Sequence, residues 1–304
     1  IQNHEEELAT GTATVNVPDI RTGDEVELLA NSFRKMEEDV ISYLRSFMAI
    51  TAENERIGAE LNVATQIQAD MLPRIFPAFP ERPEFDIYAS MTPAKEVGGD
   101  FYDFFLVDDD HLAMVIADVS GKGVPAALFM VIAKTLLKNA AQTGLPPKAV
   151  LEKVNNQLCA NNEAEMFVTV WLGIYEISTG KLTAANAGHE YPAIRRSGGR
   201  FELVKDRHGF VLAGMEDARY REYELELGMG DTLFLYTDGV AEAIGAANIL
   251  YGTERMLATL NTAPGRCPEK LLRDVKQDID RFVGDAPQFD DITMLAIQRK
   301  PNIQ

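Results

Sequence analysis

The sequence predicts an α+β domain in which two sheets pack face to face and helices cover them, preceded by one long helix. Strand-like and helix-like runs alternate irregularly beyond residue 85, and turns such as STGK and SGGR separate neighbouring strands. Short glycine-containing turns favour antiparallel pairing. The run MFVTVWLGIYEI is apolar on both faces. A strand needs this pattern when a second sheet covers one face and helices cover the other.

The long helix is expected from Asp24 to about Met71, because this stretch contains no proline and its apolar residues recur at spacings of three and four. They occupy the a and d positions of a heptad seam flanked by charged residues, and an Asn at an a position favours a two-stranded register. We therefore expect a parallel dimeric coiled coil. The alternative is a helix on its own domain, whose apolar stripe is normally wider. Residues at the a positions of this seam include Phe33, Val40, Phe47, Asn54 and Leu61.

The stretch MLPRIFPAFPERPEF ends the helix, because its four prolines at positions 73, 77, 80 and 83 form a stiff connector. The globular domain follows this connector. Within it, strands are expected over residues 85–91, 101–107, 111–117, 167–177, 181–186, 220–227, 232–236 and 292–298. Helices are expected over residues 125–141, 147–160, 253–262 and 268–283.

The composition restricts the class of partner and the compartment. The 304 residues carry 29 Lys+Arg and 47 Asp+Glu, a formal net charge of −18. Such an acidic surface repels nucleic acid. The two cysteines, Cys159 and Cys267, are too few for a disulfide framework or a zinc site, and they favour a reducing, cytoplasmic setting.

Aspartates stand at the ends of four expected strands. Asp100 follows two glycines before one strand, Asp118 ends another, and Asp238 ends a third just before Gly239. The pair at positions 290 and 291 opens the last strand. Each aspartate alone is better explained as a turn residue. Their recurrence, in most cases beside glycine, favours a shared site.

Carboxylates gathered at one edge repel one another, and their pKa values rise unless a cation neutralises them. An all-oxygen ligand set without His or Cys selects hard ions such as Mg²⁺ or Mn²⁺. Two such ions that share a bridging water lower the pKa of that water and clamp an in-line displacement at phosphorus. The glycines beside the aspartates would give the ions and a phosphate room to approach the main chain.

The motifs GGDxxD, ADVSGKG, TDGV and DDIT occur in this order, and together they resemble the SpoIIE-type bacterial branch of the PPM metal-dependent Ser/Thr protein phosphatases. NAGHEYP at residues 186–192 and QIQADMLP ahead of the domain resemble the same branch. The resemblance covers about residues 66–299. It implies a PPM-type α-β-β-α sandwich of two antiparallel sheets, two Mn²⁺ or Mg²⁺ ions, and hydrolysis without a covalent intermediate.

The resemblance also assigns roles to residues. Asp118 is implied to bridge both ions and to hold the attacking water, and Asp100 to support the first ion directly or through water. Asp291 stands where relatives outside this branch often have Asn, so it is expected to support the ligands instead of binding an ion. The implied metal ligands are Asp100, Asp118, the carbonyl of Val119, Asp238 and Asp290.

Three further residues have less specific signals. His189 lies inside NAGHEYP and is either a structural histidine or a proton donor to the leaving Ser/Thr oxygen. Lys95 and Lys122 are candidates to meet a phosphate oxygen as point charges, although solvent exposure explains either one alone. The arginine that PPM phosphatases often use near the first strand has no clear counterpart here.

A rival motif is present in CPEKLLR, residues 267–273, which has the C-x5-R spacing of cysteine-based phosphatases. That chemistry needs a glycine-rich loop whose amides cradle the phosphate. PEKLL contains no glycine and begins a helix with Pro268 in its first turn, so we reject this reading.

The N-terminal region resembles the second half of a HAMP linker. Gly11, Val15 and Val17 match the connector, and Asp24 with Glu25 opens the following helix, although a generic capped helix explains that pair equally well. A HAMP segment implies a parent protein anchored in the bacterial inner membrane, with this chain in the cytoplasm. The expected domains are a partial HAMP segment at 1–40, a coiled-coil linker at 41–72, a connector at 73–84 and the phosphatase domain at 85–304.

The sequence therefore predicts a phosphoserine/phosphothreonine protein phosphatase. The resemblance implies a phosphorylated STAS-domain anti-anti-sigma protein as substrate in a partner-switching pathway, and a parallel homodimer as the regulated form. We expect contact with a membrane only through a transmembrane region outside this chain. The alternative is a catalytically inactive dimeric scaffold that binds a phosphoprotein. A histidine kinase is set aside, because the long helix contains no His.

Overall fold

The computed structural model describes residues 20–160, 162–245 and 248–301. It divides the chain into two units, one ending at Val63 and the other beginning at Ala64. The residues Gly11, Val15 and Val17 of the HAMP-like connector lie outside the described range.

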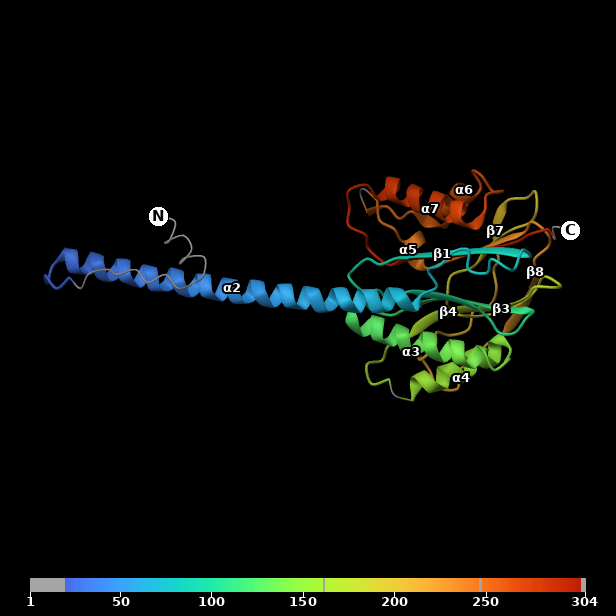
Figure 1. The fold of residues 1–304 in the computed structure, drawn as a ribbon, viewed down its shortest axis with the longest axis horizontal. Helices are drawn as coiled ribbons and strands as arrows, with labels where there is room; N and C mark the ends of the chain where they lie inside the picture. Colours follow the sequence, from blue (N-terminus) through green and yellow to red (C-terminus); the bar gives the residue numbers. More distant parts are fainter. Residues whose placement is uncertain (1–19, 161, 246–247, 302–304) are drawn as a thin grey trace. The chain divides into compact units, whose positions relative to one another are not determined.

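The first unit is formed by most of α2, a helix that runs from Glu25 to Met71 (Figure 1). Asp24 caps it, because its Oδ1 accepts a hydrogen bond of 3.0 Å from the backbone N–H of Val26. Apolar side chains of the heptad seam, such as Phe33 and Phe47, are 49% and 58% exposed. The predicted helix is confirmed, and the pairing of two such helices stays a prediction.

The second unit contains two five-stranded antiparallel sheets. The first sheet consists, in spatial order, of β1 (Phe85–Thr92), β10 (Ile292–Arg299), β9 (Thr232–Tyr236), β6 (Ala193–Arg195) and β7 (Phe201–Leu203). The second consists of β2 (Phe101–Leu106), β3 (His111–Val119), β4 (Val168–Glu176), β5 (Lys181–Ala187) and β8 (Glu222–Glu226).

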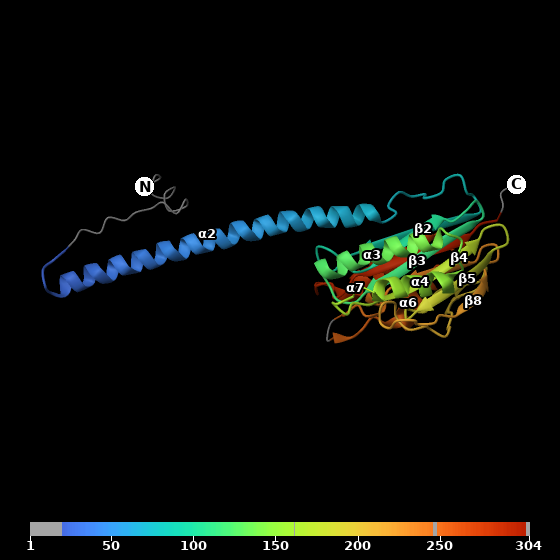
Figure 2. The same ribbon diagram turned by 90° about the horizontal axis from the view of Figure 1, so that it is seen from below.

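Helices cover the outer face of each sheet, so the unit has the layer order α-β-β-α (Figures 1 and 2). The second sheet carries α3 (Val124–Ala141) and α4 (Pro147–Cys159). The first carries α6 (Gly252–Leu260) and α7 (Pro268–Val283), together with the short α5 (Asp238–Ala241). Apolar residues of both sheets and of α3 and α4 form one continuous core. The sandwich predicted from the sequence is confirmed.

Most predicted elements agree with the structure to within about two residues. The sequence missed β6, β7 and α5, each of which is three or four residues long. So few residues carry too little periodicity to distinguish them from a loop. The strand expected at 220–227 is shorter at both ends, at Glu222–Glu226.

In the described part of the chain, α3 is the one helix that is long and apolar enough to cross a membrane by length and composition. Its inner face packs on the second sheet. There Lys134 Nζ lies 2.6 Å from Asp103 Oδ2 of β2, and both side chains are less than 10% exposed. Such a buried ion pair to a neighbouring strand is a feature of a core helix.

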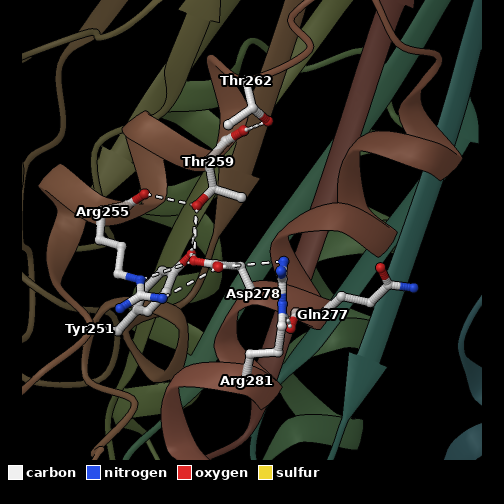
Figure 3. Close-up of polar contacts among 7 residues, drawn as sticks. All are labelled: Tyr251, Arg255, Thr259, Thr262, Gln277, Asp278 and Arg281. Atoms are coloured by element: carbon white, nitrogen blue, oxygen red, sulfur yellow. Dashed lines mark hydrogen bonds and ion pairs between the residues drawn. The ribbon is translucent and has the colours of Figure 1, made fainter.

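A polar network joins α6 to α7 (Figure 3). Asp278 Oδ2 accepts hydrogen bonds from Tyr251 Oη at 2.9 Å, from Thr259 Oγ1 at 3.0 Å and from Arg255 Nε at 3.0 Å. Arg281 Nη2 lies 3.5 Å from the other carboxylate oxygen. These hydrogen bonds, led by that from Arg255, lower the pKa of Asp278.

We expect Asp278→Ala to lower the free energy of unfolding by about 1–3 kcal/mol at pH 7, because it removes the acceptor from partly buried donors. A carboxylate with a lowered folded pKa stabilises the protein above its unfolded pKa, and that contribution is lost as the pH falls through the folded value. The difference from the wild type, measured by urea denaturation, should therefore shrink below about pH 4. Asp280→Ala removes an exposed pair with Lys276 on the same helix and should change stability by less than about 0.5 kcal/mol.

Candidate metal centre at the paired sheet edges

Two of the predicted aspartates meet at one end of the second sheet. Asp118 is the second-to-last residue of β3, and Asp100 immediately precedes β2. Because Phe101 pairs with Ala117 across the antiparallel ladder, Asp100 stands beside Asp118. Asp100 is 1% exposed.

The other two aspartates lie at the matching end of the first sheet. Asp238 is the first residue of α5, directly after β9, and Asp290 lies two residues before β10, the partner of β9. A hydrogen bond of 2.7 Å from Thr237 Oγ1 to Asp100 Oδ2 connects these strand ends of the two sheets. The structure therefore brings together all four strand-end positions that the sequence singled out.

Burial and the neighbouring negative charges raise the pKa values of three of these carboxylates. Burial and the charge of Asp238 raise the pKa of Asp118 to about 7. Burial and the charge of Asp290 raise the pKa of Asp238 to about 6. Burial, followed by the charges of Asp118 and Asp291, raises the pKa of Asp100 well above its usual range. A cation bound among these carboxylates would relieve this repulsion.

The donor set fits a hard divalent cation, because it consists of carboxylate oxygens and main-chain carbonyls. Across the described ranges, however, no group of three Asp, Glu, His or Cys side chains is arranged to hold an ion without further movement. One reason is that Asp290 Oδ2 lies 2.8 Å from Lys122 Nζ. Binding would require Asp290 to turn from this lysine or share it, with water completing the coordination.

Asp291 is held in a different way from the other aspartates. Its Oδ1 accepts a hydrogen bond of 2.8 Å from Ala94 N, and its Oδ2 accepts one of 2.7 Å from Gly99 N. A Cβ on Gly98 would lie 2.4 Å from this Oδ2, and one on Gly239 would lie 2.0 Å from the Asp291 carbonyl oxygen. The close approach of Asp291 therefore explains these two glycines, which were expected from the sequence to give ions and a phosphate room at the main chain.

Gly99 is constrained by the proposed carbonyl ligand. A Cβ at this position would lie 2.9 Å from the carbonyl oxygen of Val119, and Val119 itself is only 1% exposed. The loop before β2 therefore packs directly against the end of β3, and a side chain at residue 99 would displace the Val119 carbonyl.

One residue that sequence reasoning missed is Gln68, in the part of α2 that belongs to the second unit. Its side-chain amide makes two hydrogen bonds to Gly98, from Nε2 to the carbonyl oxygen at 2.6 Å and to Oε1 from the N–H at 3.1 Å. Gln68 is 7% exposed. Its position in the heptad seam, where an apolar residue is expected, was the signal that could have identified it.

The two lysine candidates lie in different surroundings. Lys122 Nζ donates a hydrogen bond of 2.6 Å to the carbonyl oxygen of Phe289 and lies 4.3 Å from the centre of that ring, in addition to its contact with Asp290. It therefore ties the loop after β3 to the loop before β10. Lys95 is exposed on the loop that precedes β2.

His189 is 3% exposed, and its Nδ1 lies 2.8 Å from Thr169 Oγ1. Its backbone N–H and C=O are both hydrogen-bonded to the side chain of Asn186. Burial lowers the pKa of His189 to about 3, so the imidazole is neutral at pH 7. These features favour a structural role for His189 over a role as proton donor, because a donor must reach the leaving oxygen.

Two more acidic residues contribute to the charge at this edge and were not singled out from the sequence. The charges of Glu242 and Glu190 both raise the pKa of Asp238 further. Glu190 directly follows His189 in the NAGHEYP motif, and Glu242 is the C-cap residue just after α5. Their acidic character is visible in the sequence, but their distance from Asp238 depends on the fold.

We expect Mn²⁺ affinity to rise as the pH is raised from about 6 to about 8. The pKa values of Asp118 and Asp238 are raised to about 7 and about 6, so protons compete with the cation in this range. Calorimetric titrations in two buffers with different ionisation enthalpies should show proton release on binding at pH 6 and little release at pH 8. Equal affinity at both pH values, without proton release, would contradict the involvement of these carboxylates.

Comparisons with known proteins agree with this fold. The model of the family described as Stage II sporulation protein E (SpoIIE) matches residues 108–300. The chain is 31% identical to protein IcfG of Synechocystis sp. over 312 residues. This aligned region covers 94% of this chain and 48% of that protein. It is 33% identical to phosphoserine phosphatase RsbU of Bacillus subtilis over 190 residues. That aligned region covers 62% of this chain and 55% of RsbU.

The SiaA-PP2C domain of Pseudomonas aeruginosa has a similar structure, with a TM-score of 0.72 at 24% identity over 81% of this chain and 98% of that chain. This similarity identifies the two-sheet sandwich as PP2C-like. The chain spans about half the length of the curated relatives it matches. Because the family model covers most of the sandwich, including the strand ends at Asp118, Asp238 and Asp290, the chain belongs to the SpoIIE family.

Proposed function

We propose that this protein is a metal-dependent phosphoserine/phosphothreonine protein phosphatase. The observation that carries the proposal is the convergence of Asp100, Asp118 and Asp238 at one edge, where burial and mutual repulsion raise the pKa of each. Perturbed carboxylates of this kind gather at functional sites. The printed name of the relative RsbU, phosphoserine phosphatase, supports the same activity.

When bound, two Mn²⁺ or Mg²⁺ ions would supply a water of lowered pKa and would neutralise the charge of the phosphate. Asp118 would stand between the two positions, with Asp100 and the Val119 carbonyl on one side and Asp238 with Asp290 on the other. The remaining residues position these ligands. Thr237 fixes one oxygen of Asp100 by its hydrogen bond of 2.7 Å.

The loop that carries Asp100 is positioned from two directions. Asp291 accepts hydrogen bonds from its backbone, including that of Gly99, and Gln68 binds both polar groups of Gly98. We therefore assign Asp291 a supporting role and add Gln68 to it. Lys122 holds Asp290 in the described conformation and would be free to meet a phosphate oxygen if Asp290 turned toward an ion. Lys95, on the same loop as Gly98, is the second candidate for that contact.

The proposed substrate is a phosphorylated STAS-domain anti-anti-sigma-type regulator in a partner-switching pathway. The resemblance of the motifs to the SpoIIE-type branch supports this choice, as does the similarity to RsbU. The alternative function is a catalytically inactive dimeric scaffold that binds a phosphoprotein. The presence of every proposed metal-binding aspartate, at the paired sheet edges, argues for the enzyme.

Regulation is proposed to act through the partial HAMP segment at 1–40 and the coiled-coil linker at 41–72, with the connector at 73–84 and the phosphatase domain at 85–304. The parent protein would be anchored in the bacterial inner membrane, with this chain in the cytoplasm. A change in helix pairing would reach the metal centre through the helix after Asp118 or through Gln68. Asn54→Leu should then change basal activity or Mn²⁺ dependence in a dimer of unchanged size.

We expect Phe47→Glu to convert a dimer into a monomer in light-scattering measurements at micromolar concentration. Phe47 is 58% exposed at an a position, where pairing would bury it, and a carboxylate there would face its counterpart across the seam. The matched control is Ala52→Glu, on the opposite side of the heptad, which should leave the mass unchanged. A monomeric wild type, or a dimer that survives Phe47→Glu, would exclude this seam as the interface.

The proposed activity is tested by para-nitrophenyl phosphate hydrolysis with metal-stripped protein, with and without Mn²⁺. We expect turnover only when Mn²⁺ is present, and release of phosphate from phosphoserine and phosphothreonine peptides under the same conditions. Absence of turnover at every Mn²⁺ concentration, together with retained binding of the phosphopeptides, would favour the scaffold instead.

A further inference from the structure

A groove of about 610 Å³ lies beside the proposed metal centre. Its lining comes from two parts of the chain: Cys159, Asn162, Glu165 and Phe167 in the first, and residues 210–216 except Leu212 in the second. Phe167 connects it to the centre, because its carbonyl oxygen accepts a hydrogen bond of 2.9 Å from Ser120 N and its own N–H donates one of 2.9 Å to Ser120 Oγ. Ser120 directly follows Val119. Val168, which directly follows Phe167 and is the first residue of β4, pairs with Val119.

The surface of the groove is apolar although it faces solvent. Phe167, Phe210 and Met215 are 41%, 54% and 57% exposed. Large apolar side chains that gather in a concave surface near a catalytic site mark an interaction site more often than single exposed residues do.

One wall of the groove is held rigidly by α4. Asn155, which is fully buried, accepts a hydrogen bond of 3.0 Å from Ala213 N and donates one of 2.8 Å to the Met215 carbonyl oxygen. Asn156 accepts one of 3.0 Å from Asp217 N. The segment that carries Phe210 and Met215 is therefore fixed to the helix by side-chain amides, and the groove exists before any partner binds.

The same walls contain strained backbone. In the described ranges, four non-glycine residues have a positive φ. Two of them belong to these walls, Glu165 at 50° and Ala213 at 65°, and a third, Asp217 at 56°, directly follows the second wall segment. Such conformations are unfavourable for residues with a side chain and persist where the surrounding structure imposes them. Their concentration here indicates that the shape of the groove is specified at some cost in stability.

The charged side chains of the two lining segments are all acidic. Residues 159–167 and 210–217 contain Glu163, Glu165, Glu216 and Asp217 but no Lys or Arg. Glu165 and Glu216 belong to the lining itself. An acidic, apolar groove repels an acidic surface and attracts one that combines apolar side chains with Lys or Arg.

We propose that this groove docks the phosphoprotein substrate through an apolar and basic segment that lies next to its phosphoserine. The inference rests on the proposed phosphatase activity and specifies the class of substrate that this site accepts. Phe167 places the groove directly beside the strand end that carries Asp118, so a segment seated there would present a neighbouring phosphoserine to the metal centre. Para-nitrophenyl phosphate has no flanking peptide segment to seat in the groove.

The test uses two synthetic phosphoserine peptides of equal length. In one, Leu and Lys flank the phosphoserine on both sides, and in the other Ser and Glu replace them. We expect the wild type to hydrolyse the first with a kcat/KM at least about tenfold higher, because burial of one or two apolar side chains is worth that factor or more. Phe210→Ala combined with Met215→Ala should remove most of this preference while para-nitrophenyl phosphate turnover stays within about twofold.

Two further variants make the test specific. Met229→Ala removes another exposed methionine, 46% exposed in the turn between β8 and β9, and should leave both peptide rates unchanged. Glu165→Lys combined with Glu216→Lys should shift the preference toward the acidic peptide. If the wild type hydrolyses para-nitrophenyl phosphate but treats both peptides alike, or if the groove variants keep the preference, the docking site is wrong. If the wild type hydrolyses none of the three substrates, the phosphatase activity fails, and the docking inference fails with it.

Discussion

Asp118→Asn should lower Mn²⁺-dependent hydrolysis of para-nitrophenyl phosphate about a thousandfold. The pKa of Asp118 is influenced by carboxylates of both sheets, among them Asp238, Asp100 and Asp290. An amide at this position cannot supply the negative charge that two ions would share. Ion-mediated stabilisation of the transition state is worth several kcal/mol, and each 1.36 kcal/mol corresponds to a factor of ten.

The control for this variant is Asp109→Asn, which changes an exposed carboxylate in the turn at the opposite end of β3. It should keep wild-type turnover and wild-type Mn²⁺ dependence. The urea midpoint of metal-stripped Asp118→Asn should not fall below that of the wild type, because the substitution relieves repulsion among buried carboxylates. Turnover close to the wild-type level in a folded Asp118→Asn protein would rule out its role as the bridging ligand.

Lys134→Met should lower the free energy of unfolding by about 3–5 kcal/mol. The Lys134 and Asp103 side chains are 8% and 4% exposed and 2.6 Å apart. Removing the lysine leaves a buried carboxylate without its partner, and this is strongly destabilising. The loss should be visible as a lower urea midpoint at pH 7, and it should also loosen α3, which follows the Asp118 strand end.

A double variant separates this effect from a packing defect. Lys134→Met combined with Asp103→Leu replaces the ion pair by apolar side chains, and such replacements are often neutral or stabilising. We expect it to recover most of the stability lost in the single variant. If the single variant is as stable as the wild type, the ion pair does not hold α3 to β2.

The sequence contained enough information for the layers and for the ligand positions. The run at residues 167–177 is apolar on both faces and rich in β-branched and aromatic residues, which indicates a buried strand, and aspartates recur at several strand ends. The placement of Asp100 next to Asp118 then follows from antiparallel pairing. The hydrogen bond from Thr237 to Asp100 shows that the strand ends of the two sheets meet.

Other features depend on tertiary contacts that leave little trace in the sequence. Gln68 reaches Gly98 across 30 positions, and the Lys134–Asp103 pair spans 31. Gln68 lies in QIQADMLP, and Gly98 and Asp103 lie in GGDxxD, but neither motif indicates which distant residue each side chain contacts. The reason for Gly239 also became clear only from the structure, since a Cβ there would collide with the Asp291 carbonyl. Likewise, the burial of His189 favours its structural role over a role as proton donor.

Metal titration of phosphate release tests the assignment of a two-ion phosphatase most directly. Metal-stripped protein is mixed with a phosphoserine peptide, and the rate is measured as Mn²⁺ is added in known equivalents. We expect no release without metal, a rise that saturates when two ions are bound per chain, and no comparable rise with Asp118→Asn. Release that is independent of Mn²⁺, or an equal response from Asp118→Asn, would contradict a metal centre at these sheet edges.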